Sequence, residues 1–240
     1  MKNQQYQFES FSNFENIKYG ISTREFGSMK NIETKEPDSE ALTKFAKTIG
    51  ITEPIVGMKQ IHSGNVSIIE NTDILGILDT DGLVTHKKHI PLAILTADCL
   101  PILLYDPKKE VIGVAHAGYK GLLHHIIENT VSTFVSSFKS DPKDIIVSIG
   151  PSIETTCYEV GEELIEKFQE EFPSLEDIFV ERDQKYFLDL RGIARQNFVK
   201  VGILDEHIEI MDACTKDNKD FYSYRGDDGD NRFVSVISLV

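Results

Sequence analysis

The chain has 240 residues, of which 40% are hydrophobic and 27% charged, a composition typical of a globular protein with a sizeable core. Acidic residues outnumber basic residues by 39 to 25, which gives a formal net charge of −14. This excess of negative charge disfavours a general nucleic-acid or anionic-membrane surface, so we expect no nucleic acid and no membrane among the partners.

The predicted elements alternate between short apolar runs and amphipathic stretches. In chain order, hydrophobic periodicity predicts a helix at 38–50, strands at 65–69, 82–85, 90–97, 100–105 and 111–116, a helix at 121–138, a strand at 144–149, helices at 161–172 and 189–202, and strands at 207–211 and 232–239. The runs PLAILTA, VIGVAHA and DIIVSIG are apolar on both alternations, which is typical of strands covered on both faces. Because strands outnumber helices and often follow one another directly, we predict mixed sheets in an α+β arrangement.

The chain ends and the cysteines bear on domain organisation and location. The opening residues, MKNQQYQFESFSNF, contain no apolar run and no cleavage pattern, so we expect no signal peptide. The three cysteines, Cys99, Cys157 and Cys214, form no CxxC pair, which favours reduced thiols and a cytoplasmic location. No repeat or linker divides the sequence, and residues 1–240 are predicted to form one domain. The oligomeric state stays open.

Three apolar runs end in a side chain that can bind a metal ion. These side chains are His62 in KQIHSGNV, Cys99 in LTADCLPIL and His116 in VAHAGYKG. Thiolate and imidazole both suit zinc, and three protein ligands leave the fourth position of a tetrahedral ion open for a reactant. The long spacings match no local zinc motif, however. On the residues alone, two hydrogen-bonded strand-end histidines and a small core cysteine are the favoured interpretation.

The loop after the last of these histidines has the properties of an anion cradle. Gly118 and Gly121 let the backbone approach a ligand closely, and Lys120 adds a positive charge. The helix that follows points its free N–H groups back at the loop. Most strand-to-helix turns of this kind are structural, and the loop is neither a P-loop nor a dinucleotide-binding fingerprint. Cys157 and Cys214 have no histidine nearby in sequence and are interpreted as packing residues.

The order of short motifs resembles the YfiH-type laccase-domain family, also called the multicopper polyphenol oxidoreductase or purine nucleoside phosphorylase family. The matching stretches cover nearly the whole chain and are STREFGS, KQIHSGNV, TDGLVT, PLAILTADCLPILLYDP, VIGVAHAGYKG, IGPSIETTCYEVG, FLDL and CTKDNKDFYSYR. The resemblance implies two mixed β-sheets packed face to face with helices on the outside. It also implies that His62, Cys99 and His116 bind the metal and form the catalytic centre.

The resemblance further implies a zinc enzyme, with copper as the alternative metal, that acts on purine nucleosides. The implied reactions are phosphorolysis of adenosine, inosine, guanosine and methylthioadenosine, and deamination of adenosine. Arg24 in the TR motif and Lys120 are the expected phosphate ligands, and Asn31 and Tyr119 are further expected substrate contacts. The family usually reads HAGWRG where this chain reads HAGYKG, and lysine lacks the bidentate fork with which arginine grips phosphate.

Three other functions stay open. A copper-dependent polyphenol oxidase follows from the older family name, but several copper ions need many histidines, and this chain has seven and no HxH pair. A hydrolase that edits peptidoglycan precursors would use the same fold on another substrate. A metal-binding or interaction module without catalysis is disfavoured by the open ligand position.

Overall fold

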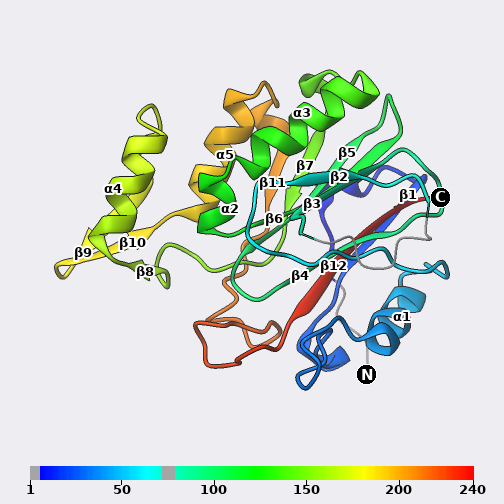
Figure 1. Cartoon of the computed structure of the whole chain (residues 1–240), viewed down its shortest axis with the longest axis horizontal. Helices are drawn as coiled ribbons and strands as arrows, with labels where there is room; N and C mark the ends of the chain where they lie inside the picture. Colours follow the sequence, from blue (N-terminus) through cyan, green and yellow to red (C-terminus); the bar gives the residue numbers. More distant parts are fainter. Residues whose placement is uncertain (1–5, 72–78) are drawn as a thin grey trace.

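A mixed six-stranded sheet forms the centre of the molecule. The computed structural model describes residues 6–71 and 79–240 and shows this sheet between helices on one side and a second sheet on the other (Figure 1). Its strands, in spatial order, are β11 (Ile208–Ile210), β7 (Ile146–Ile149), β5 (Leu100–Asp106), β6 (Val111–Ala117), β3 (Gly82–Thr85) and β2 (Val66–Ile68). The outer pairs, β11 with β7 and β2 with β3, are parallel, and the inner pairs are antiparallel.

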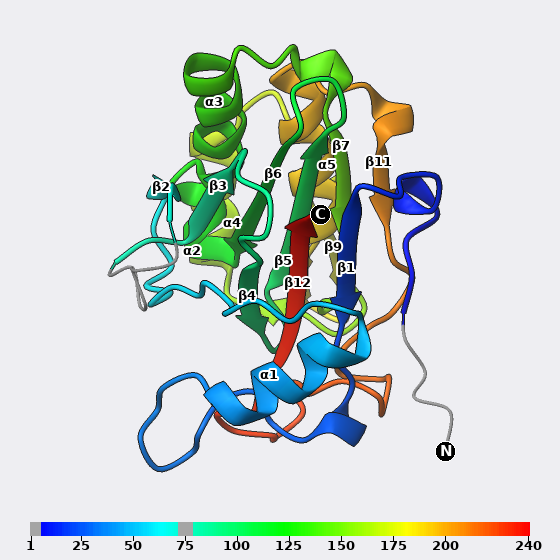
Figure 2. The same ribbon diagram turned by 90° about the vertical axis from the view of Figure 1, so that its right-hand side faces the viewer.

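A smaller antiparallel sheet packs against one face of the central sheet. It consists of β1 (Ile17–Ile21), β12 (Phe233–Leu239) and β4 (Leu92–Thr96), with β12 in the middle. Figure 2 shows the two sheets lying face to face. The apolar core between them includes Leu83, Leu92, Leu103, Val114 and Phe233, all fully buried.

Helices cover the outer face of each sheet. The helices α2 (Tyr119–Leu123), α3 (Ile126–Phe138) and α5 (Leu190–Lys200) lie over the central sheet, and α1 (Ser39–Thr48) lies under the small sheet (Figure 2). Every residue of β5 and β6 is therefore buried. This double cover explains why the sequence of both strands is apolar on both alternations.

A third sheet extends to the left of Figure 1. It consists of β8 (Glu159–Val160), β10 (Lys185–Leu188) and β9 (Phe179–Arg182), and α4 (Glu162–Glu171) packs on it. Sequence periodicity did not predict these three strands or β1, because they are short and mixed in polarity and depend on distant partners for their hydrogen bonds.

The predicted α+β class, with sheets packed face to face and helices outside, is confirmed. The predicted helix at 121–138 is wrong in one respect, because it is two helices. His125 adopts the left-handed conformation, with φ of 58°, and separates α2 from α3. The first five residues of the N-terminal stretch, in which we expect no signal peptide, lie outside the described part. Within residues 6–71 and 79–240, no helix combines the length and apolarity needed to cross a bilayer.

Candidate metal centre

The three side chains predicted to bind metal meet at one end of the central strands. His62 comes from the loop before β2, Cys99 from the turn between β4 and β5, and His116 from the end of β6. Their ligand atoms all lie within 4.8 Å of one another. Antiparallel pairing of β5 and β6 places Leu100 opposite Ala117, which brings Cys99 and His116 together where β5 begins and β6 ends. The three residues, whose spacing in the sequence matches no local zinc motif, thus form one compact ligand set in the fold.

A buried carboxylate, Asp81, positions both histidines. Its Oδ1 accepts hydrogen bonds from the backbone N–H of His62 at 3.0 Å and from Nδ1 of His116 at 2.9 Å. Its Oδ2 accepts from the backbone N–H and the hydroxyl of Ser63, at 2.6 and 2.8 Å. Because Nδ1 of His116 donates to the carboxylate, the lone pair of a neutral ring is on Nε2, which is the form a metal needs. Asp81 is not among the residues predicted from the sequence, where its one signal is its position directly before a buried strand.

The electrostatics of the cluster favour a cation. Burial raises the pKa of Asp81, but hydrogen bonds from His116 and Ser63 outweigh it and lower this pKa to about 2. Burial likewise raises the pKa of Cys99, while His116 and His62 lower it to about 6. Burial lowers the pKa of His116, and the negative charges of Cys99 and Asp81 raise it to about 9. The proton that His116 holds between two anionic groups can be replaced by a metal cation, so this donor set fits zinc.

Strained backbone supports two residues of the centre. His62 has φ of 61° and Asp98, next to Cys99, has φ of 92°, both in the left-handed region. Asp98 is held there because its Oδ1 accepts from Thr215 Oγ1 and its Oδ2 from the backbone N–H of Arg225, each at 2.7 Å. These bonds tie the segment after β11 to the turn that carries the cysteine.

Gly118 provides the space for the cysteine sulfur. A Cβ atom at this position would lie 2.7 Å from Cys99 Sγ and 3.3 Å from His62 Cδ2. The backbone of Gly118 is extended, with φ of −87°, so alanine would be strained only by this contact. We therefore expect Gly118→Ala to displace the ligands and weaken zinc binding by at least about tenfold, at a cost of about 1–3 kcal/mol in stability.

Zinc titration against a competing chelator measures this effect. Gly57→Ala is the matched control, because no atom lies within 4 Å of the Cβ that it would introduce. Equal zinc affinity in both variants would show that the close packing at Gly118 does not matter.

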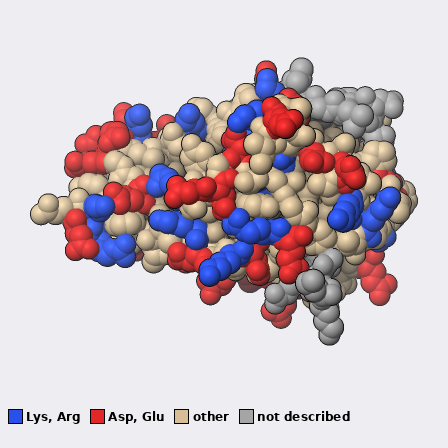
Figure 3. Space-filling view, turned by 90° about the horizontal axis from the view of Figure 1, so that it is seen from below, with Lys and Arg blue, Asp and Glu red and all other residues tan. Residues whose placement is uncertain are grey.

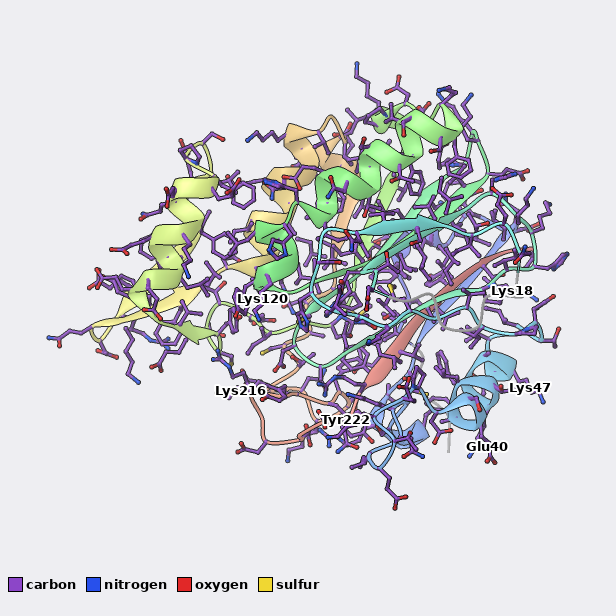
Figure 4. All side chains as sticks on the ribbon, viewed as in Figure 1. Lys18, Glu40, Lys47, Lys120, Lys216 and Tyr222 are labelled. Atoms are coloured by element: carbon purple, nitrogen blue, oxygen red, sulfur yellow. The ribbon has the colours of Figure 1, made fainter. Side chains whose placement is uncertain are left out.

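Tyr119 and Lys120 lie directly beside the ligand set, at the start of α2. Lys120 is exposed, and its ammonium group is 5.8 Å from the centre of the Tyr119 ring. Figure 4 places Lys120 on this helix, with Lys216 in the loop below it in that view. A cation and an aromatic ring thus follow His116 by four and three residues along the chain.

Arg24 and Asn31 both have hydrogen-bond partners within the protein, Arg24 in a distant loop and Asn31 in its own. The guanidinium of Arg24 forms a bidentate ion pair with Asp228, with bonds of 2.8 and 2.7 Å, and it lies 4.5 Å from the centre of the Tyr222 ring. The side chain of Asn31 accepts hydrogen bonds from the backbone of Glu33 and Thr34 and so closes a turn. Binding of substrate by either residue stays a prediction.

A basic hollow, lined in part by Cys157, was not predicted from the sequence. Its volume is about 780 Å³, and its basic side chains are Arg182, Lys185, Lys216 and Arg225. Figure 3, which shows the molecule from below, displays lysine and arginine side chains gathered in a band among acidic ones. Arg225, which lines the hollow, lies 4.8 Å from the centre of the Tyr158 ring, and burial, and then the charge of Cys99, raise the pKa of Tyr158.

Several known proteins are similar to this chain in sequence and in fold. The family described as multi-copper polyphenol oxidoreductase laccase matches residues 14–240. Purine nucleoside phosphorylase YlmD of Bacillus subtilis is 36% identical over 164 residues, which cover 67% of this chain and 59% of that protein. A purine nucleoside phosphorylase of Deinococcus radiodurans is 35% identical over 205 residues, or 85% of this chain and 78% of that protein. The crystal structure of the hypothetical protein YfiH of Bacillus licheniformis has a TM-score of 0.86 and 26% identity, covering 99% and 97% of the two chains.

Proposed function

The chain belongs to the family described as multi-copper polyphenol oxidoreductase laccase, and from this premise we propose that it is a zinc-dependent purine nucleoside phosphorylase that also deaminates adenosine. The proposed substrates are adenosine, inosine, guanosine and methylthioadenosine, with inorganic phosphate as the second substrate. Relatives that carry the name purine nucleoside phosphorylase support this choice. The observation that carries it is the convergence of His62, Cys99 and His116 within 4.8 Å.

These three residues would hold the zinc ion, and Asp81 would keep the ring of His116 in the correct tautomer. Zinc bound by one thiolate and two imidazoles supplies Lewis acidity at an open position. Asp81 is fully buried and itself bonded to the loop of His62, so the ligands are held before a substrate arrives. The ligand geometry is therefore set by the chain, as efficient catalysis requires.

Phosphorolysis needs a cation where the phosphate attacks. A phosphate oxygen forms a bond with C1′ of the ribose while the bond from C1′ to the purine nitrogen breaks, and the purine leaves with that electron pair and takes up a proton. Lys120 is exposed and free to hold the phosphate, and Tyr119 offers a ring on which the purine can stack. Arg24 could bind the phosphate only by giving up its ion pair with Asp228.

Deamination of adenosine would use the same centre. Water adds to C6 of the purine, the amino group leaves as ammonia, and inosine remains. This reaction needs no phosphate, so it separates the contribution of the metal ligands from that of the proposed phosphate ligands.

The copper-oxidase alternative receives less support from the structure. Within residues 6–71 and 79–240, three or more candidate ligands meet at two places, and only the His62–Cys99–His116 cluster contains histidine. A multicopper centre requires several histidine-rich positions close together. The remaining alternative, a hydrolase of peptidoglycan precursors, would use the same fold and metal centre on a different substrate.

One panel of assays tests the proposal. Zinc-loaded protein should release hypoxanthine from inosine only when phosphate is present, and should convert adenosine to inosine without phosphate. Oxidation of a phenol by copper-loaded protein, with no turnover of nucleosides by the zinc form, would replace the proposal with the oxidase. Release of L-serine from a muropeptide precursor, again without nucleoside turnover, would replace it with the hydrolase.

Lys120→Ala is expected to raise the KM for phosphate by about tenfold or more, because loss of one charged hydrogen bond costs about 1.5–3 kcal/mol. The KM for inosine and the rate of adenosine deamination should change little. Steady-state kinetics at varied phosphate concentration measure the effect. Lys167→Ala, which removes an exposed lysine from α4, is the control for the change in net charge. An unchanged phosphate dependence in Lys120→Ala would remove this lysine from the anion site.

A further inference from the structure

Two cysteines and an aspartate meet at a second place, away from the histidine cluster. The sulfur atoms of Cys157 and Cys214 and a carboxylate oxygen of Asp217 all lie within 4.8 Å of one another. The thiol of Cys157 donates to Asp217 Oδ2 at 3.2 Å. Cys214 is buried, whereas Cys157 lines the basic hollow. The interpretation of both cysteines as mere packing residues does not account for this convergence.

The chain holds these three acidic groups together without a basic partner. In the part of the chain that the structure describes, no lysine or arginine forms an ion pair with Asp217. Burial, the hydrogen bond to Asp217 and the neighbouring Cys214 together raise the pKa of Cys157 to about 12. Two thiols and a carboxylate gathered in this way form a ligand set for one cation, which would replace the two thiol protons.

The backbone around the three residues is ordered by hydrogen bonds. Cys214 forms a parallel bridge with Ser152, and the N–H of Thr215 donates to the Ser152 carbonyl at 3.1 Å. The N–H of Asn218 donates to the Cys214 carbonyl at 2.8 Å and closes the turn that carries Asp217. Cys214 is thus held by a paired segment, Cys157 by a turn in which its N–H donates to the Glu154 carbonyl at 2.9 Å, and the exposed Asp217 can close on an ion from the solvent side.

We propose that Cys157, Cys214 and Asp217 form a second metal site, which binds a thiophilic divalent cation, zinc, independently of the His62–Cys99–His116 cluster. Two thiolates and a carboxylate are a ligand set that zinc accepts. Ligand atoms on one tetrahedral zinc ion are about 3.3–3.8 Å apart, so the present spacing needs a closure of about 1 Å. Because Cys157 lines the hollow, water could reach a metal ion held there and complete its coordination.

The carboxylate favours a metal over a disulfide. Disulfide exchange proceeds through a thiolate, and Asp217 disfavours the thiolate of Cys157 unless a cation is present. A cation bound here would also link the segment of Cys157 to the segment of Cys214, and the second of these contacts the turn that carries Cys99. Thr215, next to Cys214, bonds Asp98, and Asp98 precedes Cys99.

Zinc binding to reduced full-length protein tests the proposal without any nucleoside assay. Wild-type protein should retain two zinc ions per chain, Cys99→Ala one, Cys157→Ser one, and the double variant none. With cobalt(II) in Cys99→Ala, the sulfur-to-metal absorption in the near ultraviolet should be strong, because only Cys157 and Cys214 remain as thiolates. Adding Cys157→Ser should reduce it at least about twofold.

Asp217→Asn in the Cys99→Ala background guards against a folding defect, because the side chain is exposed. It should weaken zinc binding by at least about tenfold, whereas Asp227→Asn, an exposed aspartate in the next loop, should not. Three results would overturn the proposal: a folded, reduced Cys99→Ala protein that binds no zinc; zinc affinity unaffected by Cys157→Ser and Asp217→Asn; or a protein lighter by two hydrogens with no free thiol at these positions, which would show a disulfide.

Discussion

The Cys99→Ala protein is expected to lose one zinc ion per chain and, with it, turnover of purine nucleosides. Removing the thiolate leaves only the imidazoles of His62 and His116, and two neutral ligands hold zinc poorly. Loss of a hydrogen-bond partner of a ligand already weakens metal binding by about 10–100-fold, so loss of a ligand should weaken it more. Elemental analysis after dialysis, together with phosphorolysis and deamination assays, measures both effects.

Both activities should fall together in this variant, since both depend on the same ligand set. Thr96→Val is the matched control, because Thr96 lies three residues before Cys99 at the end of β4 and its buried hydroxyl has no hydrogen-bond partner among residues 6–71 and 79–240. Valine has the same shape, so this variant should keep its zinc and its activity. A Cys99→Ala protein with full zinc content and full activity would contradict the proposed centre.

The interior strands of the fold could be predicted from the sequence, and the peripheral strands could not. The run of β6 is apolar at every position because helices cover one face and a sheet covers the other, and this double burial leaves a clear pattern. By contrast, β1 contains Lys18 and Gly20 and is a strand because it pairs with β12, more than two hundred residues later. A local pattern carries no record of such a partner.

The members of the candidate site could be predicted from the sequence, and the residue that positions them could not. His62, Cys99 and His116 each end an apolar run, which together with the family resemblance identifies them. Asp81 reaches His116 only because β3 and β6 pair antiparallel, with the N–H of His116 donating to the Asp81 carbonyl at 2.8 Å. Arg24 shows the opposite case: the sequence offers it as a cation for substrate, but folding places Asp228 against it.

Asp81→Asn is expected to weaken zinc binding by about 10–100-fold and to lower the free energy of unfolding by about 3 kcal/mol. The two oxygens of Asp81 accept only, from His116, from Ser63 and from the backbone of the loop of His62. An asparagine has one oxygen, so either orientation of its amide points an N–H group at another donor. The ring of His116 then loses the bond that fixes its tautomer. Zinc titration and urea unfolding of the metal-free protein measure the two effects.

The pH dependence of stability distinguishes loss of this charge from simple loss of packing. The pKa of Asp81 is lowered from 3.8 to about 2 in the folded protein. Its stabilising effect is therefore fully present above the ordinary value and is lost as the pH falls through the folded value. Metal-free Asp81→Asn should thus lose less stability than wild type between about pH 4 and pH 2.

Asp79→Asn changes an exposed neighbour that is paired with Lys59 at 3.6 Å, and this variant should follow wild type in stability and zinc affinity. Identical acid profiles and zinc affinities for Asp81→Asn and wild type would mean that this carboxylate does not orient the centre, and the ligand geometry would then depend on backbone packing alone.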